Sequence, residues 1–303
     1  MRRRRAWWLA VRPKTLSAAV APVAVGTALA AHDGRFGAVA AFAALLGAVL
    51  IQVGTNLAND VLDYRRGADH AERLGPVRVT QSGLLPPGQV AGGAALCFAA
   101  AAGVGLYLVH VAGLPILALG VLAIASGVLY TAGPVPLAYV GLGDVFVLLF
   151  FGPVAVVGTY YVQTLTVSRQ ALLLGLAVGA LAVAILNVNN LRDARTDLAA
   201  GKRTLAARLG PRSARRYFAL VVLTAFLLPM GMVGARLLPW TCLAVLAAAP
   251  AATRLVRAVT GGVEGRALNP WLGAAARLQL VHAGLLCAGL AGAWVAARPP
   301  SGP

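Results

Sequence analysis

Nine long apolar stretches divide this sequence, and they constrain its fold more than any other feature. Each approaches the roughly 20 residues that a helix needs to cross the hydrocarbon core of a membrane. Of the 303 residues, 59% are hydrophobic and 12% are charged, whereas a soluble domain carries about 25% charge. The stretches lie near residues 15–31, 38–60, 89–109, 113–131, 143–163, 170–191, 215–235, 237–256 and 277–297. We therefore expect an all-α, polytopic membrane protein of about nine transmembrane helices, forming one domain over residues 1–303.

The basic residues between these stretches predict an orientation. The formal net charge is +17, from 26 basic and 9 acidic residues. With the N-terminus inside, the inner segments hold all the bases except Arg35, Arg169, Arg236 and Arg298. Because positive charge marks cytoplasmic loops, we expect a cytoplasmic N-terminus and an external C-terminus. The same distribution favours anionic lipid headgroups of the bilayer as partners and argues against nucleic acid.

The acidic residues gather where they are least expected. All but Asp33 and Glu264 lie at cytoplasmic helix ends or in the loop that follows one of them. A carboxylate close to hydrocarbon is costly and suggests function. Acids are also disfavoured at the C-terminal end of a helix, where the helix dipole is negative. The seven residues are Asp60, Asp63, Asp69, Glu72, Asp144, Asp193 and Asp197. We infer that they serve a common site.

Two polar clusters repeat with similar spacing. In the first, Asn56, Asp60 and Asp63 stand at i, i+4 and i+7, which places them on one face of a helix. In the second, Asp193 and Asp197 are one turn apart. The two clusters end the second and the sixth predicted helix. This predicts a pseudo-repeat of two four-helix units plus a ninth helix, with both acidic faces directed at a central cavity.

Facing carboxylates need a positive partner. Packed together they would repel, and some would take up protons. Mg²⁺ prefers oxygen ligands and usually binds through one or two carboxylates plus substrate phosphates. We therefore expect a Mg²⁺-bridged diphosphate, with Mn²⁺ as a possible substitute, on a substrate with a lipid tail. Basic side chains nearby would neutralise the remaining phosphate oxygens. They are Arg65, Arg73, Arg78, Arg192, Lys202 and Arg203.

At residues 54–85, 130–144 and 187–210 the sequence resembles the UbiA-type superfamily of intramembrane aromatic prenyltransferases. The two Asp-rich motifs of that superfamily bind Mg²⁺-diphosphate. The chain departs from the common first motif because Gly67 stands where a third acid is usual and Asp69 follows two residues later. That variant resembles the branch that prenylates 1,4-dihydroxy-2-naphthoate.

The resemblance implies both an activity and its residues. A polyprenyl group would pass from polyprenyl diphosphate to 1,4-dihydroxy-2-naphthoate, with loss of diphosphate and CO₂, in menaquinone synthesis at a bacterial cell membrane. The first motif with a lid loop would occupy 54–88, and the second motif with its loop 187–212. The implied metal ligands are Asp60, Asp63, Asp193 and Asp197. The implied substrate-binding residues are Asn56, Asn59, Arg65, Asp69, Arg78, Tyr130, Tyr139, Asn189, Asn190 and Lys202.

Two alternatives stay open at this point. The acceptor could be 4-hydroxybenzoate or another phenol, because the diphosphate machinery would be the same. An ion-coupled transporter also has intramembrane acids and an internal repeat, but it predicts acids at the middle of the membrane and helices broken there. For Tyr130 and Tyr139, the alternative to substrate binding is that each is an aromatic residue at the membrane interface. Prenyl chain length, oligomeric state, the deprotonating group and the roles of Asp69 and Asp144 are not predicted.

Overall fold

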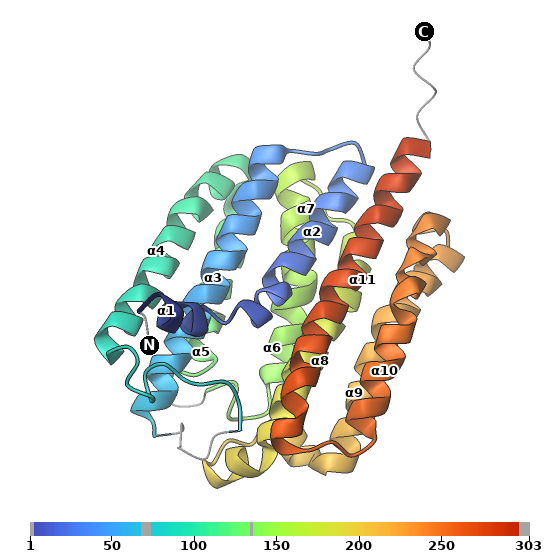
Figure 1. The fold of residues 1–303 in the computed structure, drawn as a ribbon. Coiled ribbons are helices and arrows are strands. Elements are labelled where there is room, and N and C mark those ends of the chain that lie inside the picture. The colour runs from blue at the N-terminus through green and yellow to red at the C-terminus, as the bar shows by residue number, and fades with distance from the viewer. Residues whose placement is uncertain (1–2, 68–73, 134–135, 297–303) are drawn as a thin grey trace.

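The computed structural model describes residues 3–67, 74–133 and 136–296, and every regular element in this part of the chain is helical (Figure 1). The elements are α1 (Arg3–Val11), η1 (Pro13–Thr15), α2 (Ser17–His32), α3 (Ala38–Arg65), α4 (Pro87–Ala112), α5 (Leu114–Leu129), α6 (Gly143–Leu149), η2 (Phe150–Val154), α7 (Ala155–Thr164), α8 (Arg169–Ala199), α9 (Leu205–Gly234), η3 (Trp240–Ala248), α10 (Ala249–Thr260), η4 (Gly265–Leu268) and α11 (Asn269–Ala296). The predicted all-α class is confirmed.

The helices have the length and apolarity of a multi-pass membrane protein. Within the described residues, 7 are long and apolar enough to cross a membrane, or 8 if the pair α1–η1 and α2, bent by 51°, is one span. Each predicted apolar stretch coincides with helical structure. The predicted number of nine is not confirmed, because α5 has only 16 residues and falls short of membrane length.

The span predicted at 143–163 is a broken helix. α6 and α7 are joined by the π-helical turn η2, in which Gly152 leaves the helical region with φ −125° and ψ −109°. Pro153 follows, and a proline has no backbone N–H to donate within a helix. The apolar pattern of the sequence does not distinguish such a turn from a straight helix.

The broken helix packs tightly against α8 through glycines. A Cβ atom placed on Gly175 would lie 2.6 Å from Cα of Pro153, and one placed on Gly179 would lie 2.6 Å from the carbonyl oxygen of Leu148. Small residues allow transmembrane helices to approach closely. Backbone-to-backbone contact therefore fixes η2 against the central helix.

We expect Gly175→Leu to destabilise the protein, because the added side chain must push α8 away from η2. Overpacking of this kind costs about 1–3 kcal/mol. Thermal unfolding of the detergent-solubilised protein measures the loss. Gly284→Leu is the matched control, since the space around this exposed α11 residue is open. Equal melting temperatures for the two variants would contradict the tight contact.

α8 is the central helix of the bundle. In its apolar window 78% of the residues are buried, compared with 17% to 39% in the other membrane-length helices. The largest buried core cluster joins it to α2, α7, α9, η3, α10 and α11. In the second acidic motif, at the C-terminal end of α8, Asp193 is buried and Asp197 is half-buried.

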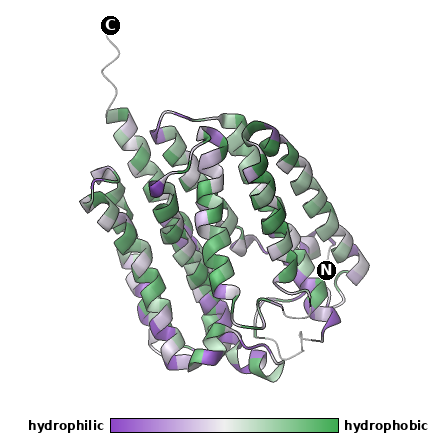
Figure 2. Ribbon diagram, turned by 180° about the vertical axis from the view of Figure 1, so that it is seen from behind, coloured by the Kyte–Doolittle hydropathy of each residue, from purple (hydrophilic) through white to green (hydrophobic). Residues whose placement is uncertain are grey.

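The polar segments gather at one end of the molecule. In Figure 1 the C-terminal ends of α3 and α8 lie at the bottom, and α11 ends at the top. Hydrophilic residues are concentrated at that lower end in Figure 2, and the middle parts of the helices are largely hydrophobic. The fold thus brings the two motifs to the same side of the apolar layer.

Candidate active site

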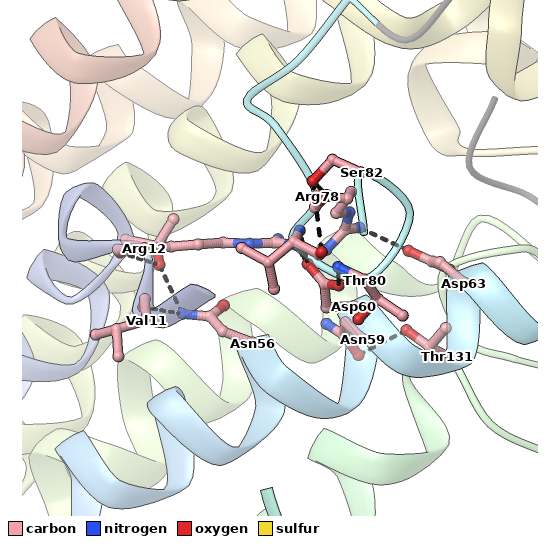
Figure 3. Close-up of polar contacts among 12 residues, drawn as sticks. Val11, Arg12, Asn56, Asn59, Asp60, Asp63, Arg78, Thr80, Ser82 and Thr131 are labelled. Carbon is pink, nitrogen blue, oxygen red and sulfur yellow. Dashed lines mark hydrogen bonds and ion pairs between the residues drawn. The ribbon is translucent and has the colours of Figure 1, made fainter. Parts of the chain in front are cut away.

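Residues 78–80, which follow the first motif in the chain, fold back against its two aspartates (Figure 3). The Asp60 carboxylate accepts hydrogen bonds from the backbone N–H groups of Val79 at 3.3 Å and Thr80 at 3.0 Å. One turn later, Asp63 forms an ion pair with Arg78, with Nη2 and Oδ2 2.6 Å apart. All five residues are buried. Residues 78–80 therefore hold both carboxylates in place.

The N-terminal segment contributes a cation that the sequence analysis did not identify. Arg12 lies 3.8 Å from the Asp60 carboxylate (Figure 3). Asn56 anchors the segment, because its amide donates to the carbonyl oxygen of Val11 at 2.9 Å and to the Thr15 hydroxyl at 3.0 Å. One predicted substrate-binding residue, Asn56, thus positions Arg12 beside the acid.

The second motif carries its own arginine. Arg192 donates two hydrogen bonds to Asp193, from Nε at 2.8 Å and from Nη2 at 2.5 Å. Such forked, charge-assisted pairs are strong. Nη1 of Arg192 also donates to Asn269 at the start of α11, and Asn269 donates to the carbonyl oxygen of Leu74. The loop after the first motif is thereby tied to the second motif.

Tyr139 lies between the two motifs. Its hydroxyl donates to Asp63 at 3.4 Å. The ammonium group of Lys202 lies 5.7 Å from the centre of the Tyr139 ring, within the range of a cation–π interaction. Lys202 is also 3.9 Å from the Asp197 carboxylate. A continuous series of contacts therefore joins an aspartate of the first motif to an aspartate of the second.

Tyr130, which directly follows α5, is a second link. Burial raises the pKa of Tyr130, and the negative charges of Asp144, Asp63 and Asp197 raise it further. The phenol therefore stays protonated near neutral pH and can donate a hydrogen bond. Its hydroxyl is within electrostatic reach of both acidic motifs.

An apolar cavity of about 690 Å³ adjoins this site. All the residues that line it fall between Ala19 and Val162, on α2 to α7, and none of them lies on α8. Gln52 and Tyr130 are among its few polar lining residues. Gln52 donates to Asn56 at 3.4 Å. The polar end of the cavity therefore reaches the first motif.

The other predicted site residues differ in their burial and hydrogen bonds. Asn59 accepts a hydrogen bond from Thr131 at 2.6 Å, and Asn189 accepts one from Arg192. Asn190 is buried on α8, whereas Arg65 is exposed at the end of α3. Asp69 lies outside the described residues, as do Glu72 and Arg73.

The donor set fits a divalent cation that shares its ligands with a substrate. Among the described residues, no group of three or more His, Cys, Asp or Glu side chains could hold a metal ion. Mg²⁺ usually needs only one or two protein carboxylates when substrate phosphates and water complete its shell. Two pairs of aspartates with neighbouring amides provide such ligands. The cations now beside them, Arg78, Arg192 and Lys202, are suited to the same phosphates.

The chain matches the UbiA prenyltransferase family over residues 19–272. It is 41% identical over 266 residues to the 1,4-dihydroxy-2-naphthoate octaprenyltransferase of Mycobacterium tuberculosis, and the aligned region covers 88% of this chain and 90% of that protein. It is 39% identical over 243 residues to the protein of the same name from Haemophilus influenzae, covering 78% of this chain and 79% of that one.

Two solved structures share the fold. One is a UbiA homolog from Archaeoglobus fulgidus bound to DMAPP and Mg²⁺, with a TM-score of 0.67 and 15% identity, covering 96% of this chain and 99% of that one. The other is the apo structure of a UbiA homolog from Aeropyrum pernix K1, with a TM-score of 0.68 and 17% identity, covering 90% and 96%.

Proposed function

This chain belongs to the UbiA prenyltransferase family, and we propose that it transfers a polyprenyl group from polyprenyl diphosphate to 1,4-dihydroxy-2-naphthoate, with loss of diphosphate and CO₂. The relatives from Mycobacterium tuberculosis and Haemophilus influenzae, both named for that acceptor, support it. One structural observation carries the proposal: an apolar cavity ends near the aspartate-bearing end of α3, and contacts through Tyr139 and Lys202 join that end to the aspartate-bearing end of α8. The reaction belongs to menaquinone synthesis.

The four aspartates are proposed to hold the diphosphate through divalent cations. Asp60 and Asp63 would bind from α3, and Asp193 and Asp197 from α8. The metal is proposed to be Mg²⁺, as in the Archaeoglobus fulgidus homolog, and Mn²⁺ offers the same charge. When bound, it supplies positive charge that stabilises the departing diphosphate.

The basic side chains of the site are proposed to change partners when diphosphate arrives. Arg78, Arg192 and Lys202 now neutralise carboxylates. Once those carboxylates bind metal, the same cations are free to donate to phosphate oxygens, Arg by forked hydrogen bonds and Lys as a point charge. Arg12, beside Asp60, joins this group. The site is therefore neutralised both with and without its substrate.

The apolar cavity is proposed to hold the prenyl tail. Its apolar walls suit a hydrocarbon chain, and its aromatic lining includes Phe146, Phe150 and Phe151 of the broken helix. Aromatic rings present a negative face that attracts cations, so they suit the allylic carbocation left by the departing diphosphate. A water-poor cavity protects that cation from capture by water.

The active site is proposed to open to the cytoplasm of a bacterial cell. The motif-bearing end of the bundle carries most of the basic residues, which is the mark of a cytoplasmic face. The exposed Trp8 on the arginine-rich helix α1 suits the membrane interface. The N-terminus would then be inside and the C-terminus outside.

Product analysis tests the reaction. Purified protein is incubated with Mg²⁺, a polyprenyl diphosphate and either 1,4-dihydroxy-2-naphthoate or 4-hydroxybenzoate, and products are identified by mass. We expect a prenylated naphthalene product that has lost CO₂. EDTA should stop the reaction and excess Mg²⁺ should restore it, because the aspartates need a cation to hold diphosphate. Transfer to 4-hydroxybenzoate alone would establish the other acceptor, and full activity in EDTA would exclude the metal.

A further inference from the structure

Asp144 is a buried acid that the diphosphate site does not require. It lies at the start of α6, and only 4% of the residue is exposed. Its Oδ1 atom is enclosed and makes no hydrogen bond with the part of the chain that the structure describes. A buried polar atom without a partner is costly, and a carboxylate at the edge of the apolar layer is more so. These costs suggest a partner that arrives with a substrate.

Two tyrosines surround this carboxylate. The hydroxyl of Tyr217, from α9, lies close enough to the carboxylate for the two groups to influence each other electrostatically. Tyr130 lies on another side, since its hydroxyl would be 3.1 Å from a Cβ atom on the adjacent Gly143. Tyr130 also lines the apolar cavity. Asp144 therefore directly follows a residue that packs against Tyr130, a lining residue of the cavity.

We propose that Asp144 is the general base that accepts a hydrogen bond from a hydroxyl group of the aromatic acceptor and takes its proton, and that Tyr217 is the positioning residue for its carboxylate. This inference rests on the proposed function, because it assigns the group that deprotonates the acceptor in that reaction. The free oxygen of Asp144 supplies the hydrogen-bond acceptor that a phenolic hydroxyl needs. It would also repel a carboxylate, and so favour entry of the acceptor with a hydroxyl foremost.

The step is balanced in atoms and electrons. The C–O bond of the allylic diphosphate breaks, and its electron pair leaves with the diphosphate. A ring carbon of the acceptor forms the new C–C bond with the allylic carbon, which places a positive charge on the ring. Transfer of the hydroxyl proton to Asp144 removes that charge and leaves a ring carbonyl. The allylic C–O bond and the O–H bond of the acceptor are broken, a C–C bond and an O–H bond on Asp144 are formed, and the proton resides on the carboxyl group.

The surroundings of Asp144 define the expected pH dependence. The titratable and charged groups near it are Tyr217 from α9 and Tyr130 from the end of α5, and the charges of Asp63 and Asp197 also act on Tyr130. Arg208, in the first turns of α9, approaches the backbone near Gly141. A base must be ionised to act, so kcat should fall as the pH drops through the titration of Asp144.

Asp144→Asn tests the assignment. It should lower kcat for prenyl transfer by about 100-fold or more, the range typical of a lost general base, and should remove the acidic limb of the pH profile. Mg²⁺-dependent binding of a non-reactive polyprenyl thiodiphosphate should stay unchanged, because Asp144 does not hold the diphosphate. Asp144→Glu should recover part of the rate. Tyr217→Phe should lower kcat less and shift the acidic limb.

Three outcomes would overturn the assignment: near wild-type kcat in Asp144→Asn, an acidic limb unchanged by that substitution, or an equal loss of thiodiphosphate binding. If Asp144→Asn does not fold, the pH profile of kcat is measured in Tyr217→Phe instead. An unshifted profile in that variant contradicts the proposal. Failure of the proposed function itself looks different, because wild-type protein would then not prenylate 1,4-dihydroxy-2-naphthoate.

Discussion

Asp60→Asn and Asp193→Asn are each expected to abolish prenyl transfer. Each substitution removes one negative charge from a cluster that must hold a metal-bound diphosphate, and a carboxamide is a poor ligand for Mg²⁺ by comparison. Because stabilisation of a leaving group's charge contributes strongly to rate, we expect kcat to fall by about 100-fold or more in each variant. The rate is measured as product formed from polyprenyl diphosphate and 1,4-dihydroxy-2-naphthoate under saturating Mg²⁺.

The chain offers a matched control for both variants. Asp33 is also an aspartate at a helix end, though an exposed one, and it accepts a hydrogen bond from Tyr160 at 2.7 Å. It lies at the end of α2, on the side of the bundle away from the two motifs (Figure 1). Asp33→Asn should keep wild-type transfer. Near wild-type rates in Asp60→Asn or Asp193→Asn would remove that residue from the site.

Gly120→Trp is expected to block transfer of long prenyl chains. Gly120 lines the apolar cavity, and the space beside it is open. An indole ring there would occupy the volume proposed for the prenyl tail, and each 1.4 kcal/mol of lost binding is tenfold in affinity. We expect kcat/KM for a long polyprenyl diphosphate to fall by at least about tenfold. Dimethylallyl diphosphate, which needs little of the cavity, should still react.

The contrast between long and short substrates makes this result specific. A general loss of folding would lower both rates together. Gly284→Trp is the control, because Gly284 also has open space beside it but lies on the exposed face of α11, away from the cavity. If Gly120→Trp uses long and short diphosphates as well as the wild-type protein does, the tail must lie elsewhere.

The sequence predicts the helices well and their interruptions poorly. Membrane-length apolar runs locate the helical stretches because the bilayer requires internally hydrogen-bonded backbone. The same runs do not reveal the π-helical turn η2, because Gly152 and Pro153 depend on close contact with α8 for their conformation. They also do not reveal that the residues lining the cavity all lie on α2 to α7.

The sequence also identifies the acids of the site better than their partners. Helical spacing shows that Asp60 and Asp63 share a face, since the rule depends only on local geometry. Arg12, Asn269 and Tyr217 reach the acids from distant parts of the chain. Nothing in their local sequence distinguishes them from other interfacial polar residues. Their roles emerge only when the packing of the helices is known.

Stoichiometric binding of diphosphate most directly tests whether both motifs hold one headgroup. Calorimetry with a non-reactive polyprenyl thiodiphosphate and Mg²⁺ should give one bound molecule per chain in the wild-type protein. Asp60→Asn and Asp193→Asn should each weaken that binding by at least about tenfold, and their combined effect should be less than additive because they share the ligand. Binding of wild-type strength after loss of either aspartate, or two independent sites per chain, would contradict a shared site.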